Sequence, residues 1–223
     1  MPQLIELKAA SPLVSGAYRN VYQHPHHDDL LVKVIKPIVI ERHAARANWY
    51  DSWYGSGYYG TLLREIEKYL VLHRRGQQNL PFIQHFVGLI ETDLGLGMVV
   101  SKVRGRDGKL APTVFEIVQS RGLDGELASR IAGLRDDVVR HHVVFGDVSA
   151  SNIVEAADAP HSHRLIIIDG LNDRLWLPVN SMSRTFNRIY CERRFARMMQ
   201  SLAAIERERR AGVTGSPVPA ARD

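Results

Sequence analysis

The chain has 223 residues, enough for one compact domain or for one domain with two lobes. Its hydrophobic fraction of 45% and charged fraction of 24% are average for globular proteins, and they exclude a wholly disordered or fibrous chain. The single cysteine, Cys191, excludes an internal disulfide and a Cys-rich metal site, so we expect a reducing, cytoplasmic setting. We expect neither a transmembrane segment nor a signal peptide, because no apolar run approaches roughly 18 residues.

The formal net charge of +5 is concentrated near the end of the chain. Residues 184–210 contain eight arginines and three glutamates, a local surplus equal to that of the whole protein. The simplest interpretation is a solvated helix face whose long side chains cover a core stripe. The functional alternative is an anionic partner, which includes nucleic acid, an acidic protein or a membrane surface.

The first half of the chain has the pattern of a small antiparallel sheet. Residues 4–36 predict three short strands, the last of which is an apolar run that Pro37 ends. Aromatic residues crowd positions 49–59 and indicate an ordered insertion to which we assign no role. Thr61 is expected to cap a helix that runs to about Arg75, and 86–91 with 97–103 predict a hairpin.

The second half is predicted to be mainly helical. Its clearest signal is one helical face with apolar residues spaced by four, three and four: Leu127, Ile131, Leu134 and Val138. Short strands are predicted at 143–145, 153–154 and 165–168. The last helix, 184–210, is expected to bury a stripe of apolar side chains: Phe186, Ile189, Tyr190, Met198, Met199, Leu202 and Ile205. The fold class is therefore a two-lobed α+β arrangement.

Three oxygen-bearing side chains in this half have the spacing that phosphoryl transfer requires. Asp147 follows a short apolar segment, Asn152 comes five residues later, and Asp169 follows four apolar residues. An aspartate in the position of Asp147 orients or deprotonates an acceptor hydroxyl. The amide oxygen of Asn152 and the carboxylate of Asp169 are hard donors that suit Mg²⁺. Taken alone, the Asp147–Asn152 spacing is also compatible with a simple turn.

These segments resemble the protein-kinase-like fold and, within it, the YrbL-type family known as PhoP regulatory network proteins. The resemblance covers about residues 10–190. Glycine and proline in residues 211–223 predict a flexible tail. The resemblance implies an N-terminal sheet lobe with one helix over 1–103 and a reduced helical C-lobe over 104–210. It also implies a nucleotide between the lobes, with ATP and Mg²⁺ as ligands. Asp147 resembles the catalytic-loop aspartate, Asn152 its asparagine, and Asp169-Gly170-Leu171 the metal-binding Asp-Phe-Gly motif.

The same resemblance assigns residues of the first lobe. Lys33 resembles the strand lysine that contacts the α- and β-phosphates, with Lys36 as a competitor on the other face. Glu65 resembles the helical partner of that lysine, with Glu67 as the alternative. Gly16 lies where a glycine-rich phosphate loop is expected. The segment expected to contact adenine includes Val99, Ser101 and Val103.

The sequence also departs from the kinase pattern. Gly16 is the single glycine of the predicted phosphate loop, Phe145-Gly146 replaces His-Arg before the aspartate, and only 54 residues follow Asp169. We therefore expect the platform on which protein kinases hold a peptide to be largely missing. We expect an ATP-dependent phosphotransferase that acts on a hydroxyl, more readily of a small molecule than of a protein. The alternatives are a catalytically silent nucleotide-binding regulator and a basic nucleic-acid-binding module.

Overall fold

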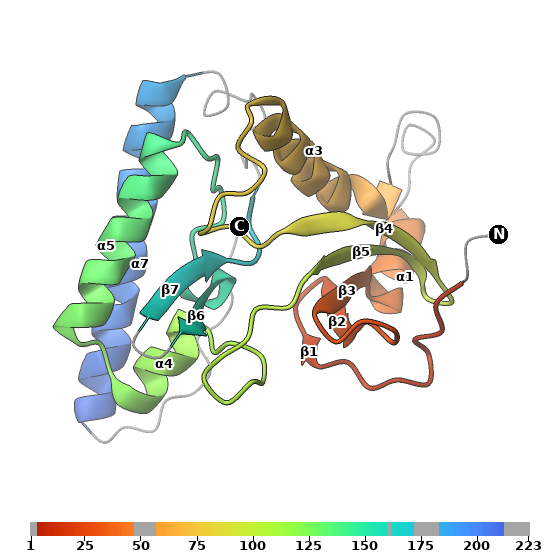
Figure 1. The fold of residues 1–223 in the computed structure, drawn as a ribbon, viewed down its shortest axis with the longest axis horizontal. Helices are drawn as coiled ribbons and strands as arrows, with labels where there is room; N and C mark the ends of the chain where they lie inside the picture. Colours follow the sequence, from red (N-terminus) through yellow and green to blue (C-terminus); the bar gives the residue numbers. More distant parts are fainter. Residues whose placement is uncertain (1–3, 47–56, 160–161, 172–182, 212–223) are drawn as a thin grey trace. The chain divides into compact units, whose positions relative to one another are not determined.

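The computed structural model describes residues 4–46, 57–159, 162–171 and 183–211 (Figure 1). The chain forms two compact units, Met1–Val103 and Arg104–Asp223. The first unit contains five strands, two α-helices and one 3-10 helix among its described residues: β1 (Val14–Ser15), β2 (Arg19–Gln23), β3 (Leu30–Ile35), α1 (Pro37–Arg46), η1 (Gly57–Tyr59), α3 (Gly60–Arg74), β4 (Phe86–Thr92) and β5 (Gly95–Ser101).

The strands of the first unit form one antiparallel sheet in the order β1-β2-β3-β5-β4. The predicted strands in 4–36 and the predicted hairpin are confirmed, although the hairpin turn is shorter than expected because β4 extends to Thr92 and β5 begins at Gly95. Gly95 has a φ of 102°, which a non-glycine residue rarely adopts. The mixed α+β class follows from this sheet and the helices around it.

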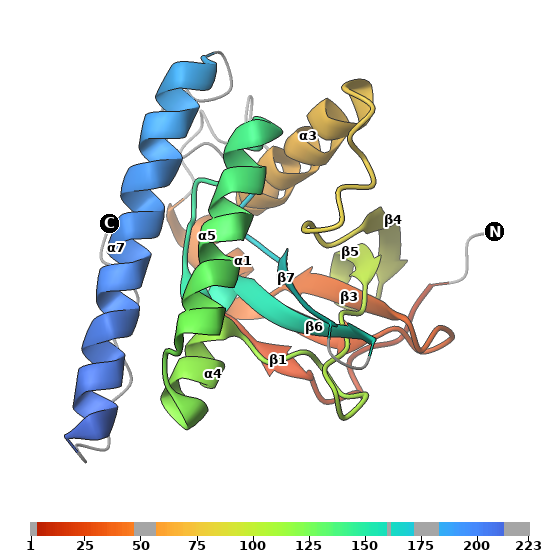
Figure 2. The ribbon, with the colours of Figure 1, turned by 60° about the vertical axis from the view of Figure 1, so that its left-hand side comes forward.

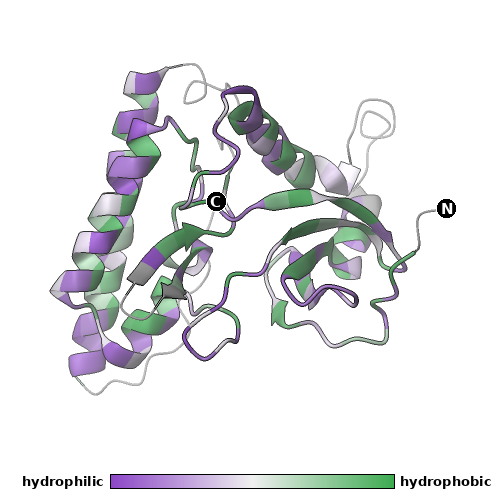
Figure 3. Cartoon of the chain, viewed as in Figure 1, coloured by the Kyte–Doolittle hydropathy of each residue, from purple (hydrophilic) through white to green (hydrophobic). Residues whose placement is uncertain are grey.

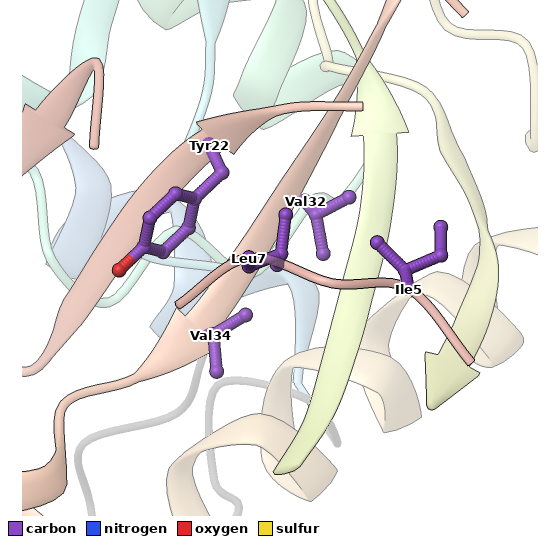
Figure 4. Packing of buried hydrophobic residues seen from close by; sticks show 5 residues of the cluster. All are labelled: Ile5, Leu7, Tyr22, Val32 and Val34. Carbon is purple, nitrogen blue, oxygen red and sulfur yellow. The ribbon is translucent and has the colours of Figure 1, made fainter. Parts of the chain in front are cut away.

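One face of this sheet is a hydrophobic core closed by the N-terminal segment. Ile5 and Leu7 cross the sheet and pack against Tyr22, Val32 and Val34 (Figure 4). Backbone bonds from Ile5 N to Glu91 O and from Asp93 N to Ile5 O hold the segment at the edge of β4. The alternating strand residues on this face are therefore apolar and buried.

Helix α3 covers the opposite face. The cross-strand register places Lys33 beside Val21 and Met98, and it places Arg19 beside Ile35 on the same face as Lys33. Tyr69 of α3 stacks on Phe86 of β4, with the ring centroids 5.2 Å apart. Side chains from the sheet and from α3 thus share one buried layer.

The second unit combines α-helices with a two-stranded sheet. Its described elements are α4 (Val114–Arg121), α5 (Gly125–Arg140), η2 (Ala150–Asn152), β6 (Ile153–Ala159), β7 (Ser162–Ile167) and α7 (Arg184–Arg210). Helix α7 packs along α5 and α4, as Figure 2 shows. All four residues of the predicted α5 face are buried, and Figure 3 shows hydrophobic and hydrophilic residues alternating along α5 and α7.

The helix starts follow ordinary capping chemistry in this unit. Thr113 and Glu116 form a reciprocal capping box at the start of α4, and Asp124 accepts from Leu127 N at 2.7 Å at the start of α5. These bonds satisfy backbone donors that the helix itself leaves without partners. None of the helices within the described residues is long and apolar enough to span a membrane.

Several local predictions are wrong. The first unit has a second α-helix, α1, where one helix was expected over 1–103, because Pro37 suits a first helical turn as well as a strand end. Thr61 does not cap α3, which begins at Gly60 after Tyr59. The predicted strand 143–145 is coil. Residues 49–56 of the aromatic stretch, and 212–223 of the predicted tail, lie outside the described residues.

The predicted core stripe of the last helix is also partly wrong. Phe186 and Ile189 are exposed, at 59% and 41% of their accessible surface. The residues that α7 buries recur every three or four positions: Asn187, Cys191, Phe195, Met198, Leu202 and Glu206. Only Met198 and Leu202 of the predicted set belong to that stripe. Two polar residues at its ends, Asn187 and Glu206, concealed its phase in the sequence.

Candidate functional site

The segment that carries Asp147 is a buried coil held by the turn after β7. Gly146 N and Asp147 N both donate to Gly170 O, at 3.1 and 3.2 Å. Phe145, just before them, is completely buried and meets Phe195 of α7 edge to face. The Asp147 segment and the Asp169 segment, 22 positions apart in the sequence, are therefore bound to each other through the backbone.

Asn152 lies at the end of η2 and bonds to both the Asp147 segment and the Asp169 segment. Its Nδ2 donates to Asp147 O at 3.0 Å, and its backbone oxygen accepts from Ile168 N at 2.9 Å. The side-chain bond engages only the amide nitrogen. The amide oxygen is consequently the atom that Asn152 has to offer a cation.

Asp169 lies in a tight turn whose shape depends on Gly170. The Oδ1 atom of Asp169 accepts from Gly170 N at 2.6 Å, and Gly170 has a φ of 87°. A Cβ atom on Gly170 would lie 2.8 Å from Asp147 O and 2.9 Å from Cε2 of Phe145. Only glycine permits this close approach, so the sequence Asp169-Gly170 is required for the contact with Asp147.

Helix α7 holds the Asp147 segment from the other side. Asn187, 1% exposed, donates from Nδ2 to Val143 O at 3.0 Å, and Tyr190 donates from Oη to Gly146 O at 3.1 Å. Arg194 lies over the Tyr190 ring and donates to Tyr190 Oη at 3.2 Å. Since a buried coil leaves carbonyls without ladder partners, these side chains supply the missing donors.

Asn187 and Tyr190 were not singled out as site residues from the sequence. A signal was present for Asn187, because it has a four-residue spacing with Cys191 and Phe195 on one helix face. Burial raises the pKa of the Cys191 thiol to about 11, so Cys191 is an unreactive packing residue beside Asn187.

The first unit brings Lys33 and Glu65 into the layer between the sheet and α3. Lys33 is 6% exposed and Glu65 is 2% exposed. Glu67, the alternative to Glu65, points outward, with 61% of its side chain exposed. Arg19, at the start of β2, forms an ion pair with Glu65 at 2.7 Å. Sequence reasoning assigned no role to Arg19, although it shares a sheet face with Lys33.

The two remaining predicted segments lie on or beside strands of the first sheet. Gly16 lies in the turn between β1 and β2, where its N–H donates to Arg19 O at 2.9 Å. Val99 and Ser101 lie on β5, and Val103 follows it. Ser101 O accepts from Nε2 of the buried Gln84 at 2.7 Å, and Ser101 N donates to His85 O.

The donor set of the second unit suits a hard cation. Asn152 and Asp169 offer an amide oxygen and a carboxylate from adjacent backbone segments, and Mg²⁺ typically takes one or two such protein ligands with phosphates and water. Among the described residues, no group of three or more His, Cys, Asp or Glu side chains is arranged to hold a metal ion. A site of the Asn–Asp type does not require such a group.

Comparison with known proteins places this chain in a family. The model of the family described as "PhoP regulatory network protein YrbL" matches residues 5–203. The chain belongs to the YrbL family. The YrbL match includes every residue of the two clusters described above.

The similarity of this chain to individual YrbL proteins is low. The chain is 23% identical over 184 residues to "Uncharacterized protein YrbL" of Escherichia coli (strain K12), which covers 81% of this chain and 80% of that protein. The same values hold for the protein of the same name from Shigella flexneri. The family is thus established, together with the association with a PhoP regulatory network that its name carries.

Proposed function

We propose that this YrbL-family protein is an ATP-dependent phosphotransferase with a protein-kinase-like fold, which transfers the γ-phosphate of ATP to a hydroxyl group. The observation that supports the proposal is that backbone and amide hydrogen bonds join the segments of Asp147, Asn152 and Asp169. The spacing of these three residues in the sequence independently suits phosphoryl transfer. A simple turn at 147–152 needs no bonds to the segment around Asp169.

Each residue has a defined part in the proposal. Asn152 and Asp169 would hold Mg²⁺, which when bound neutralises charge on the phosphates. Asp147 accepts the proton of the acceptor hydroxyl while the hydroxyl oxygen bonds to the γ-phosphorus and ADP leaves. Lys33 contacts the α- and β-phosphates. The buried Glu65 compensates its charge.

Arg19 adds to this scheme a second cation beside Glu65. The Arg19–Glu65 pair fixes the carboxylate where β2 faces α3, close to the turn that contains Gly16. Because Arg19 already orients the Glu65 carboxylate, less free energy is needed to position that carboxylate against Lys33 when the nucleotide binds. We therefore assign Arg19 a positioning role.

A thermal-shift titration with Mg-ATP tests nucleotide binding. Binding to the native state at about one hundred times the dissociation constant adds about 2.7 kcal/mol of stability. We expect stabilisation by Mg-ATP in the wild type and its reduction in Asp169→Asn and Lys33→Met. Asp136→Asn, an exposed carboxylate of α5, is the matched control and should behave as the wild type.

Transfer of label from γ-labelled ATP tests the reaction. Metabolites and proteins of an extract should gain label with the wild type and the Asp136→Asn control, and they should not with Asp147→Ala or Asp169→Asn. Stabilisation by Mg-ATP without any transfer or phosphate release would instead favour the silent nucleotide-binding regulator, an alternative that the single glycine at Gly16 supports. Absence of stabilisation would contradict both.

A further inference from the structure

Helix α7 presents a solvent-facing line of side chains opposite its core stripe. Phe186, Ile189, Arg193 and Arg197 follow one another at spacings of three, four and four residues and are all exposed. We call these four residues the outer stripe. Residues with these spacings lie on one side of a helix, over a length of about 16 Å at about 1.5 Å per residue.

The outer stripe combines two arginines with two large apolar side chains. Arg188 pairs with Glu192, and both Arg209 and Arg210 pair with Glu206. Within the described part of the chain, Arg193 and Arg197 have no carboxylate partner. The stripe therefore has a surplus of positive charge at one end and exposed hydrophobic surface at the other.

The composition of α7 favours a protein as the partner. Its eight basic residues are all arginines, and protein interfaces are enriched in arginine and aromatic residues and depleted in lysine. The main apolar side of α7 is already buried in the unit, so Phe186 and Ile189 are too few for a helix that inserts into a membrane surface. Phe186 is the single aromatic ring of the outer stripe and offers one base-stacking surface, and the two arginines of the stripe neutralise few phosphates.

We propose that the outer stripe docks an acidic amphipathic segment of a partner protein. Apolar side chains of the segment would pack on Phe186 and Ile189. Carboxylates one turn apart would bind Arg193 and Arg197, whose Cα atoms lie about 6 Å apart along the helix axis. Because none of these residues belongs to the proposed phosphotransfer site, docking and phosphoryl transfer succeed or fail independently.

A fluorescent helical peptide is the probe. The peptide carries two leucines, followed on the same helix face by two glutamates, one and two turns further along and four residues apart. A scrambled peptide of equal composition is the comparison. We expect the full-length protein to bind the ordered peptide about tenfold more tightly than the scrambled one. Arg193→Glu/Arg197→Glu should remove that preference, and Phe186→Ala should weaken it severalfold.

The matched control places the same charge change on another helix. Arg135 and Arg140 lie on α5 and are paired with Asp136 and Asp137. Arg135→Glu/Arg140→Glu should keep the preference for the ordered peptide, while circular dichroism verifies that each variant is folded.

Three results would overturn the proposal. The first is equal binding of the ordered and scrambled peptides. The second is an equal loss of binding in the α5 control, which would show that only net charge matters. The third is binding of a single-stranded oligonucleotide or of phosphatidylserine vesicles that depends on Arg193 and Arg197, when the ordered peptide does not bind.

Discussion

The two units hold their polar clusters by different means. In the first unit, Lys33 and Glu65 project from a strand and a helix into a buried layer. In the second unit, Asp147 and Asp169 lie outside helices and strands, and Asn152 ends a single 3-10 turn. Regular elements fix the first cluster, whereas individual hydrogen bonds fix the second: Gly170 O accepts two of them, and Asn152 and side chains of α7 donate the others.

This difference determines how each cluster should respond to mutation. A change in the first cluster leaves a charge inside a packed layer, so it should lower the stability of the whole unit. A change in the second cluster removes one of several bonds to a coil. It should therefore displace the Asp147 segment with a smaller cost in global stability.

The largest effect is expected from Glu65→Leu. The substitution removes the carboxylate that pairs with Arg19 at 2.7 Å and that shares the buried layer with Lys33. Removing one member of a buried pair typically costs about 3–5 kcal/mol. Urea unfolding monitored by circular dichroism measures the loss.

Two variants sharpen this prediction. Glu67→Leu changes the neighbouring exposed glutamate, and its effect should stay within about 0.5 kcal/mol. Arg19→Met/Glu65→Leu removes the Arg19–Glu65 pair but keeps the buried Lys33, so it should recover part of the lost stability. If the double variant is as unstable as Glu65→Leu, the Arg19–Glu65 charge pair is not the source of the effect.

A smaller loss of stability, but a larger loss of activity, is expected from Gly170→Ala. The positive φ and the contact with Asp147 O together should cost about 1–3 kcal/mol. Label transfer from ATP should fall much more than stability does, because the Asp147 segment must move. Gly133, in the middle of α5, has open space where a Cβ would lie, with nothing within 4 Å, so Gly133→Ala should stabilise the protein by up to about 1 kcal/mol. A cost for Gly170→Ala above that of Glu65→Leu would reverse the comparison of the two units.

Tyr190→Phe should lower stability by only about 1 kcal/mol, because it deletes one hydroxyl and keeps the ring. The lost bond to Gly146 O should nevertheless accelerate hydrogen exchange in the segment 143–149. Exchange in β3 of the other unit is the internal reference. Unchanged exchange at 143–149 would exclude Tyr190 as a positioning residue, whether or not the protein has phosphotransferase activity.

The smallest effect is expected from Glu206→Gln, on the stability of the protein at acid pH. Arg209 and Arg210 lower the pKa of Glu206 from 4.5 to about 2, while Glu206 also accepts from Leu123 N at the start of the loop to α5. Its stabilising contribution is therefore complete above about pH 4.5 and is lost as the pH falls toward 2. The melting temperature of Glu206→Gln should consequently depend less on pH between 5 and 2 than that of the wild type. Glu208→Gln, at an exposed position of α7, should retain the wild-type dependence.

Local sequence patterns predicted those parts of the fold whose periodicity is clean. The stripe from Leu127 to Val138 and the strands in 4–36 are apolar at regular spacing, and the structure has them as predicted. Residues 143–145 are equally apolar but form a coil, in which Asn187 and Tyr190 of α7, and not a neighbouring strand, bind the carbonyls of Val143 and Gly146. A β-branched run alone does not distinguish these two environments.

Spacing and residue chemistry grouped Asp147, Asn152 and Asp169, and the structure joins their segments by backbone and amide hydrogen bonds, while their role in phosphoryl transfer stays a prediction. The partners of these residues could not be identified in the same way. Arg19 meets Glu65, and Tyr190 meets Gly146, across 46 and 44 positions of sequence. Only the packing of α3 on the sheet and of α7 on the coil decided these contacts. A helix of this composition can bury any of several faces, and the buried hydrogen bonds determine which face it buries.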